Sequence, residues 1–498
     1  MEQISLIPTV SSVNKTDTFV THSSFSHDNV CTQTERVALE KRYAQLLIEN
    51  DEFNRQLVSY QGNKGALVHS WIRYREGFSA QLVENLINKF NINETILEPF
   101  AGSATTLLVA KFLGLNATGI ELLPVCHLAW EAKSKIWEYD IGLLKQIYQQ
   151  LYDSQPIDLH SKFPHITITE SAFPPKNERD VMFYSHWFKQ LNLREPEKTL
   201  CQLVLTSILE EVSYTRKDGQ YLRWDYRSAK VQNRNARKIA QGKKPTHKID
   251  FGSIATVKNV LLRAFNRVLT DITTLQNLPL HHKSQTLLKG NALLILPTLE
   301  SNHFGGVITS PPYCNRYDYT RTYALEIAYL NTASDIRDLR QNLLSCTVEN
   351  RPKLSLLENH YRSIGQYKRY QTILSVVQNN RVFKEINQAL QTRWRRGDIN
   401  NKGVLTMVEQ YFTELTFVFA ELFRTCQSKA YVVFVNDNVR YGGEVIPVDL
   451  LSTSLAEMLG FEAIAVYVLP KKKGNSSQQM KKFGREPLRK SITLWQKP

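Results

Sequence analysis

The stretch Thr95-Ile-Leu-Glu-Pro-Phe-Ala-Gly-Ser-Ala-Thr-Thr-Leu-Leu-Val-Ala110 runs from apolar residues through a group of small residues into a second apolar run. This order is typical of a buried strand, a tight turn and a helix. The small residues from Ala101 to Ala104 allow the backbone to approach a ligand closely, and the amides that open the following helix can meet a carboxylate or a phosphate. Many strand-to-helix turns contain glycine, so this pattern needs a second feature before it indicates a cofactor site.

The second feature is an acidic residue about twenty positions further on, which is the usual spacing for a carboxylate that binds a ribose. The β-like run Asn116–Glu121 predicts another strand, and Glu121 stands at its end with Leu122 after it. A carboxylate there can accept both hydroxyls of an adenosine, although a solvent-facing glutamate at a strand end would look the same. Together the two features favour a cofactor that carries a nucleoside.

Short β-like runs and helical stretches alternate along much of the chain, which predicts an α/β fold with a mostly parallel sheet flanked by helices. The further runs are Thr286–Leu288, Gly306–Thr309, Ala430–Asn436, Ala463–Leu469 and Ser491–Trp495. Two long segments, 155–283 and 331–403, interrupt this alternation and are mainly helical in pattern. We therefore divide the chain into a mobile tail (1–35), an N-terminal helix (36–66), core segments (67–154, 284–330 and 404–498) and the two insertions.

The positive charge of this chain is concentrated. The formal net charge of +15 divides into +8 for Tyr214–Asp250, +7 for Arg351–Asn400 and +8 for Pro470–Pro498, with −8 for the remainder. One such run can be a solvated helix face, but three indicate a polyanionic partner such as DNA. The sequence has no apolar run long enough for a membrane span and no secretory signal, and its six scattered cysteines suggest no metal site and no disulfide framework. We expect a cytoplasmic protein.

The run Gly306-Val-Ile-Thr-Ser-Pro-Pro-Tyr313 places a rigid corner after a buried strand. The prolines fix φ and supply no N–H groups, so the Ser310 hydroxyl and the neighbouring carbonyl are held as fixed hydrogen-bonding groups. Open α/β sheets bind their ligands at this end of their strands. Such a corner suits an exocyclic amino group, whose hydrogens it can draw out of the ring plane. A rigid loop or a proline-rich ligand segment is the alternative.

Glu98-Pro-Phe-Ala-Gly-Ser-Ala-Thr-Thr and Ser310-Pro-Pro-Tyr313 resemble the two signatures of the S-adenosylmethionine-dependent DNA amino-methyltransferases of restriction-modification systems. The resemblance implies a Rossmann-like sheet that ends in an antiparallel hairpin. It also implies double-stranded DNA with one flipped base as substrate, a separately encoded restriction endonuclease as partner, and association with the nucleoid of a prokaryote. The family usually has glycine where this chain has Ala104, and we expect the extra methyl group to crowd the cofactor slightly. Serine at the first position resembles the cytosine-N4 form of the second signature.

The segment Trp71–Val83 is similar to the one that, in the family, precedes the strand of the first signature and closes over the methionine end of the cofactor. The resemblance also implies roles for individual residues. For catalysis it indicates Ser310, Pro311, Pro312 and Tyr313. For the cofactor it indicates Phe78, Ser79, Glu98, Pro99, Phe100, Ala101, Gly102, Ser103, Thr105, Thr106, Glu121, Leu122, Asn291 and Ala292. Ser79 is equally a plausible helix N-cap, and Asn291 stands where the family often has aspartate; either side chain can hydrogen-bond an amino group.

The basic segments and the loops near the catalytic corner supply the candidate DNA contacts, with the two insertions as candidates for sequence recognition. The candidate contact residues are Arg223, Arg227, Arg234, Arg237, Lys238, Arg316, Arg321, Lys472 and Lys473. Arg316 and Arg321 can equally form loop salt bridges with Asp318 and Glu326. Three other functions stay open: an adenine-N6 or RNA amino-methyltransferase, a non-catalytic DNA-binding subunit with this fold, and a nicotinamide dehydrogenase.

Overall fold

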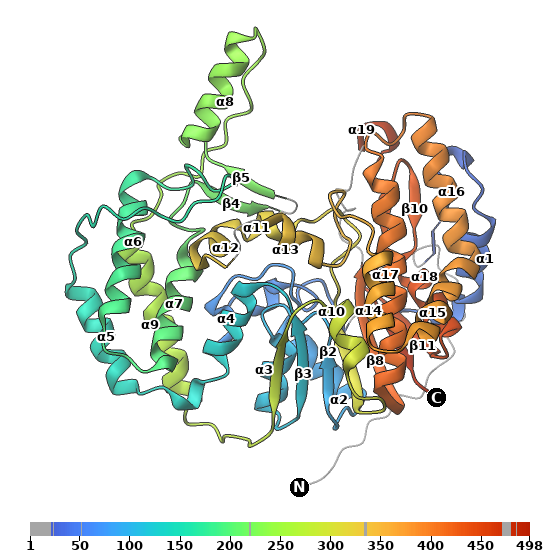
Figure 1. Ribbon diagram of the computed structural model, residues 1–498, viewed down its shortest axis with the longest axis horizontal. Coiled ribbons are helices and arrows are strands. Elements are labelled where there is room, and N and C mark those ends of the chain that lie inside the picture. The colour runs from blue at the N-terminus through green and yellow to red at the C-terminus, as the bar shows by residue number, and fades with distance from the viewer. Residues whose placement is uncertain are drawn as a thin grey trace.

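A single eight-stranded sheet forms the centre of the molecule (Figure 1). The computed structural model describes residues 21–498 except 23, 51, 219–220, 333–335, 471–479 and 485. Across the sheet the strands are β1 (Leu47–Glu49), β11 (Glu462–Val468), β12 (Lys490–Gln496), β8 (Cys426–Asp437), β7 (Phe304–Thr309), β2 (Ile96–Glu98), β3 (Ala117–Glu121) and β6 (Gln285–Lys289). Strand β12 runs antiparallel to both of its neighbours, and all other pairings are parallel. The predicted α/β class and the C-terminal antiparallel hairpin are confirmed.

Helices cover both faces of the sheet, because successive residues of the central strands are apolar and point to opposite sides. In β2, Ile96 faces one hydrophobic core and Leu97 faces the other. The first core includes α2 (Ala80–Lys89), α3 (Thr105–Phe112) and α4 (Pro124–Lys133); the second includes α10 (Ala292–Ile295), α17 (Gly403–Thr425) and α18 (Val448–Met458). The carboxyl ends of the parallel strands remain free to carry a site.

The first insertion forms a helical lobe beside α4, on the left in Figure 1. Its helices α6 (Pro175–Gln190), α7 (Glu195–Ile208) and α9 (Val257–Leu275) pack with α5 (Ile141–Asp153). A hairpin of β4 (Thr215–Asp218) and β5 (Tyr221–Trp224) leads from this lobe into α8 (Ala229–Ala240), which projects from the body of the molecule. Among the α8 residues only Val231 is buried. The insertion is mainly helical as predicted, with this hairpin added.

The second insertion packs on the opposite side of the sheet. It consists of α14 (Leu354–Ser363), α15 (Tyr367–Asn379) and α16 (Arg381–Arg395), which extend the layer formed by α17, and of α13 (Ile336–Asn342), which instead contacts α11 (Tyr319–Thr322). Between the catalytic corner and this insertion lie α11 (Tyr319–Thr322) and α12 (Ala324–Leu330). The part of the chain that the structure describes also contains α19 (Met480–Phe483), a small hairpin of β9 (Val439–Tyr441) and β10 (Glu444–Ile446), and six short 3-10 helices.

The N-terminal region differs from its prediction in two ways. The expected N-terminal helix (36–66) is wrong beyond Arg42, because α1 (Thr34–Arg42) ends there and the chain then adds β1 to the sheet edge beside β11. The expected mobile tail is also wrong from Ser24 onward. Phe25 is 1% exposed in a small core with Val445, and Ser26 donates a 2.8 Å hydrogen bond to Glu444. Long-range contacts therefore order a stretch whose composition resembles a tail; residues 1–20 lie outside the described residues.

Much of the charge in the second basic run is used inside the fold. The Lys353 ammonium lies 3.0 Å from Glu414, Arg369 pairs with Glu421 at 2.9 Å, and Arg393 pairs with Glu444 at 2.7 Å. Each of the three acidic partners is almost fully buried. These cations are therefore not available to DNA. No helix among the described residues has the length and the apolar stretch that crossing a bilayer requires.

Candidate active site

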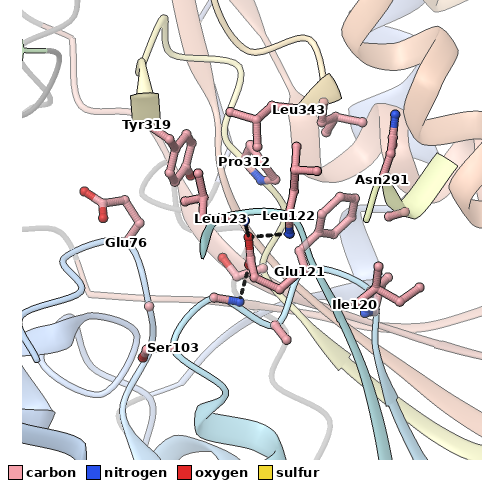
Figure 2. Close-up of a pocket in the computed structure, with 18 of the residues that line it drawn as sticks. Glu76, Ser103, Ile120, Glu121, Leu122, Leu123, Asn291, Pro312, Tyr319 and Leu343 are labelled. Carbon is pink, nitrogen blue, oxygen red and sulfur yellow. Dashed lines mark hydrogen bonds between the residues drawn. The ribbon is translucent and has the colours of Figure 1, made fainter. Parts of the chain in front are cut away.

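A central pocket opens at the carboxyl ends of β2, β3 and β7 and beside the loop that follows β6, and it brings together most of the predicted cofactor residues (Figure 2). The predicted residues that line it are Phe78, Pro99, Phe100, Ala101, Gly102, Ser103, Thr105, Glu121, Leu122, Asn291 and Ala292. Ser310 and Pro312 of the catalytic corner line the same pocket. Two stretches that lie about two hundred residues apart in the chain therefore share one cleft.

Three predicted cofactor residues lie behind the pocket wall. Ser79 is buried and accepts a 3.1 Å hydrogen bond from the Leu82 amide, so it is the N-cap of α2. Glu98 accepts hydrogen bonds from the Thr106 hydroxyl at 3.0 Å and from the Phe100 amide at 3.3 Å. Burial raises the pKa of Glu98 to about 8. These residues hold the loop and the helix that form the pocket and do not line it.

Glu121 is held rigidly at the floor of the central pocket. One carboxylate oxygen accepts a 2.7 Å hydrogen bond from the Gly102 amide, and the other accepts bonds of 2.7 Å from the amides of Leu122 and Leu123 (Figure 2). Burial raises the pKa of this carboxyl group to about 7, although the three amides oppose the shift. Because a carboxylate has about four acceptor positions, three amide bonds still leave Glu121 able to accept a hydroxyl from a ligand.

Gly102 lies directly under an aromatic ring that the sequence analysis did not identify. Its φ is +53°, in the left-handed region that favours glycine, and a Cβ there would stand 2.6 Å from the Tyr74 ring. Tyr74 stacks on Tyr323 with ring centroids 5.2 Å apart. Tyr74 lies in the segment that the resemblance places over the methionine end of the cofactor, and it belongs to the pocket lining.

The expectation for Ala104 is corrected. Its side chain is fully buried in the first core, and it does not line the central pocket. The residue adopts φ +61° and ψ +37°, a left-handed conformation that costs a non-glycine residue roughly 1 kcal/mol. The alanine therefore affects the backbone energy of the turn and does not crowd a ligand.

Asn291 presents a hydrogen-bond donor to the pocket. Its Oδ1 accepts a 3.0 Å bond from the Leu293 amide and caps α10, while its Nδ2 is buried without a hydrogen-bond partner among the described residues. An amide nitrogen can donate but cannot accept. The unpartnered Nδ2 suits a ring nitrogen of an adenine, and Oδ1, which accepts one bond and has a second acceptor position, can still accept from an amino group. The expected contact with the amino group therefore stays a prediction.

A second pocket, which we call the tyrosine pocket, lies on the other side of the catalytic corner. It measures about 280 Å³, and its lining includes Val58, Ser59, Arg75, Pro311, Tyr313, Asn315, Tyr317, Asp437 and Lys490. Glu76, Gly77 and Tyr319 line both pockets. Successive residues of the corner thus alternate between the pockets: Ser310 and Pro312 face the central one, Pro311 and Tyr313 the tyrosine one.

A small polar network fixes Tyr313. The Ser310 hydroxyl donates to the Tyr313 hydroxyl at 3.1 Å, and the Lys490 ammonium donates to the same oxygen at 3.2 Å. Lys490 also pairs with Asp437 at 3.0 Å and lies 4.9 Å from the centroid of the Tyr313 ring. The sequence analysis did not identify Lys490 or Asp437, which stand at the ends of the paired strands β12 and β8.

Glu76 is a further residue that the sequence analysis missed. Its carboxylate accepts hydrogen bonds from the hydroxyls of Tyr317 and Tyr323, and burial raises its pKa. The side chain stands where the two pockets meet. The only signal in the sequence is its place within the segment that resembles the cofactor lid of the family.

The predicted DNA-binding residues have different environments. Arg227 forms two bonds, of 2.7 and 2.8 Å, with the buried Asp225 carboxylate, and Arg321 pairs with Asp318 and Glu349, both at 3.2 Å. These two arginines are therefore engaged in the fold. Arg223, Arg234 and Arg237 are exposed, Lys238 is half-buried on α8, and Arg316 follows the corner with φ +67°. Lys472 and Lys473 lie outside the described residues.

The sheet, the nucleoside-type pocket and the diproline corner define this chain as an enzyme of the methyltransferase class. The chain belongs to the Type II DNA methyltransferases of restriction-modification systems. It is 53% identical over 479 residues to the Type II methyltransferase M.BsoBI of Geobacillus stearothermophilus, and these residues make up 95% of this chain and 94% of the relative. The Type II methyltransferases M.AvaI of Nostoc sp. and of Anabaena variabilis are each 36% identical over 476 residues, or 93% of both chains. No family model matches.

Proposed function

We propose that this enzyme transfers a methyl group from S-adenosylmethionine to the N4 atom of a cytosine in double-stranded DNA. The target base would be swung out of the duplex, because its amino group is out of reach inside the stack. Membership of the family identifies a DNA methyltransferase but does not name the base that this enzyme modifies.

The alternation of the catalytic corner between two pockets carries this proposal. A methyl transfer needs a donor and an acceptor on either side of one small set of catalytic groups, and Ser310 to Tyr313 separates the central pocket from the tyrosine pocket. Holding both reactants in such an arrangement can supply on the order of 7–11 kcal/mol of barrier reduction. Neither a nicotinamide dehydrogenase nor a simple DNA-binding subunit requires this division.

The residues of the central pocket fit S-adenosylmethionine. Glu121 would accept a ribose hydroxyl, the buried Nδ2 of Asn291 would donate to a ring nitrogen of the adenine, and the segment Tyr74–Phe78 would cover the methionine end. When bound, this cofactor would supply a sulfonium methyl group: the amine nitrogen would form the new C–N bond as the C–S bond breaks to leave a neutral thioether, and the nitrogen would then lose one proton. DNA methyltransferases generally use it.

The corner would prepare the amine. The Ser310 hydroxyl and the neighbouring backbone carbonyl are fixed hydrogen-bonding groups that would draw the amino hydrogens out of the ring plane and favour a nucleophilic nitrogen. Tyr313 would stack on the extruded base. Lys490, already 3.2 Å from the Tyr313 hydroxyl, would offer a donor to N3, the ring nitrogen of cytosine next to the carbon that carries N4.

Nucleoside analysis tests this proposal. The purified chain would be incubated with labelled S-adenosylmethionine and mixed-sequence DNA, and the DNA would then be digested to nucleosides. Labelled N4-methylcytosine is the expected product, and Ser310→Ala should form it much more slowly. Labelled N6-methyladenine would overturn the choice of base, and tight cofactor binding without any transfer would favour the non-catalytic alternative.

The expected endonuclease partner can be tested separately. DNA that this enzyme has modified to completion should resist a cognate restriction endonuclease, whereas the same DNA treated with the Ser310→Ala variant should be cut. Equal cleavage of both samples would contradict a protective role against that endonuclease.

A further inference from the structure

A third pocket, which we call the arginine pocket, lies apart from the catalytic corner. It measures about 470 Å³ and lies between residues 60–73, the end of α7, β4 and the first half of α9. Its lining includes the cations Lys64, Arg73, Arg216, Arg263 and Arg267 and the acids Glu210 and Glu211. Five positive side chains thus face two negative ones, which leaves an excess of three positive charges around one concave surface.

The cations of this pocket differ in how far the fold neutralises them. Arg73 pairs with Glu210 at 3.4 Å, and Arg263 pairs with Glu211. By contrast, the exposed side chains of Lys64 and Arg267 form no hydrogen bond or ion pair with any residue that the structure describes. The pocket therefore keeps positive charge that its own acids do not neutralise.

Arg216 is held in place at the wall of this pocket. Its guanidinium donates to the carbonyl oxygens of Glu210 at 2.6 Å, Thr215 at 2.7 Å and Ser213 at 3.1 Å, and it lies 5.0 Å from the Phe251 ring. Carbonyl oxygens do not cancel its charge as a carboxylate would. The pocket thus combines one fixed cation with the two exposed ones.

The arginine pocket and the tyrosine pocket share a dividing ridge. Ser59 lines the tyrosine pocket, and the next residue, Tyr60, lines the arginine pocket. In a second segment, Arg75 lines the tyrosine pocket and Arg73 lines the arginine pocket. Arg75 crosses the ridge by donating to the Lys217 carbonyl of β4. The two pockets are therefore neighbours, although the chain segments that form them come from different parts of the sequence.

We propose that the arginine pocket binds a backbone phosphate of the DNA strand whose base enters the tyrosine pocket. This inference rests on the proposed function. A nucleotide that leaves the stack takes its flanking phosphates with it, and a phosphate next to the base pocket needs cations that the fold has not already neutralised. Lys64 and Arg267 are these cations, and Arg216 provides a fixed charge behind them.

A charge-matched pair of variants tests the inference. Lys64→Gln/Arg267→Gln removes the two exposed cations of the pocket, whereas Lys145→Gln/Lys189→Gln removes two exposed cations of α5 and α6 outside it. DNA affinity would be measured by fluorescence anisotropy across a range of KCl concentrations, in the presence of S-adenosylhomocysteine. We expect the first variant to bind DNA more weakly and to flatten the dependence of log K on log[KCl] by about 0.9 for each phosphate that is no longer neutralised. The second should match the wild type.

Other outcomes separate this inference from the proposed function. If the first variant keeps the wild-type salt dependence while the wild type still methylates DNA, the pocket does not bind the DNA backbone. If inorganic phosphate alone binds the wild type but not the first variant, and the DNA salt dependence of both is equal, the pocket serves free phosphate and the inference is overturned. Failure of the wild type to methylate any DNA would instead contradict the proposed function.

The phosphate that the pocket binds can be mapped once the modified base is known. A methylphosphonate, which is uncharged, would replace one phosphate at a time around the target base. We expect the affinity of the wild type to fall when a phosphate that flanks the target is replaced, and that of Lys64→Gln/Arg267→Gln to fall no further at that position. If each methylphosphonate lowered the affinity of Lys64→Gln/Arg267→Gln as much as it lowers that of the wild type, the assignment of the phosphate to this pocket would be contradicted.

Discussion

The Gly102 amide donates a 2.7 Å hydrogen bond to the Glu121 carboxylate and so joins the turn after β2 to the end of β3. Both residues line the central pocket, and each fixes part of its geometry. The glycine gives the turn its left-handed backbone, and the glutamate fixes the direction of its amide. This pair makes the cofactor site a single rigid unit.

Gly102→Ala should weaken cofactor binding and lower the melting temperature. An added Cβ would meet the Tyr74 ring at 2.6 Å and would hold an alanine at φ +53°, which together cost about 1–3 kcal/mol. Isothermal titration with S-adenosylmethionine and thermal unfolding would measure both effects. Gly65→Ala is the control, because nothing lies within 4 Å of its added Cβ. Retained affinity in Gly102→Ala would remove the glycine from the site.

Cofactor affinity should fall as the pH is lowered from about 8 to about 6. Burial raises the pKa of Glu121 to about 7, so the carboxyl group takes up a proton in this range and loses acceptor capacity for a ribose hydroxyl. Glu121→Gln should bind the cofactor weakly and with a flatter pH dependence. Titrations at a series of pH values would check this, and an unchanged slope in the variant would assign the pH dependence to another group.

The raised pKa of Glu121 also predicts that lowering the pH, which weakens cofactor binding, makes the folded protein more stable. The pKa of Glu121 in the folded protein lies above its usual value of 4.5, so the folded state binds this proton more tightly than the unfolded state does. The resulting stabilisation is complete below about pH 4.5 and is lost as the pH rises through about 7. Glu121 therefore makes the protein more stable near pH 6, so unfolding caused by this group cannot account for a weaker cofactor affinity there. The free energy of unfolding, measured with denaturant at each pH, would verify this.

Ser310→Ala should lower kcat by about 10²–10³-fold, the usual effect of removing one preorganised hydrogen-bonding group, while cofactor affinity stays near that of the wild type. Tyr313→Phe keeps the aromatic ring and loses only the hydroxyl bonds to Ser310 and Lys490, so we expect a smaller decrease. Tyr313→Ala should cost about 1–3 kcal/mol in binding of the extruded base. Single-turnover rates with labelled cofactor would rank the three variants; equal rates for all of them would contradict the proposed corner.

Neutralising Arg234, Arg237 and Lys238 should weaken DNA binding and reduce its salt dependence, because these residues belong to the projecting helix α8. Arg381, Lys384 and Lys368 of α15 and α16 provide a matched triple variant from the second basic run. DNA binding over a range of salt concentrations would compare the two insertions directly. A larger effect in the second triple would move DNA recognition to that insertion.

Local patterns predicted the sheet well. Each of the seven predicted strand runs overlaps an observed strand, because buried apolar runs bounded by turn residues depend mainly on neighbours in sequence. The conformation of Leu47–Glu49 could not be predicted in this way. Its extended form is set by pairing with Val466–Val468, more than four hundred residues away, and its own residues fit a helix equally well.

The site was only partly predictable for the same reason. The resemblance identified the residues of two continuous signatures, but Tyr74, Glu76 and Lys490 lie outside those signatures and reach the pockets through the folded chain. The charge pattern was less informative, because a count of lysines and arginines does not reveal a buried partner. Arg227 and Arg393 looked like DNA contacts or solvated charges, and both are paired within the fold.

The sequence by itself determined the class of the fold, the small-residue turn with its acidic partner, and the stiff Ser-Pro-Pro-Tyr corner, because these depend on residues that are close together in the chain. Only the tertiary structure decided that the corner divides two pockets, that Asn291 turns a donor inward, and that Lys64 and Arg267 keep unneutralised charge beside the base pocket. These properties arise where distant segments meet and their charges pair or remain unpaired, and no local pattern records which partner a side chain will find.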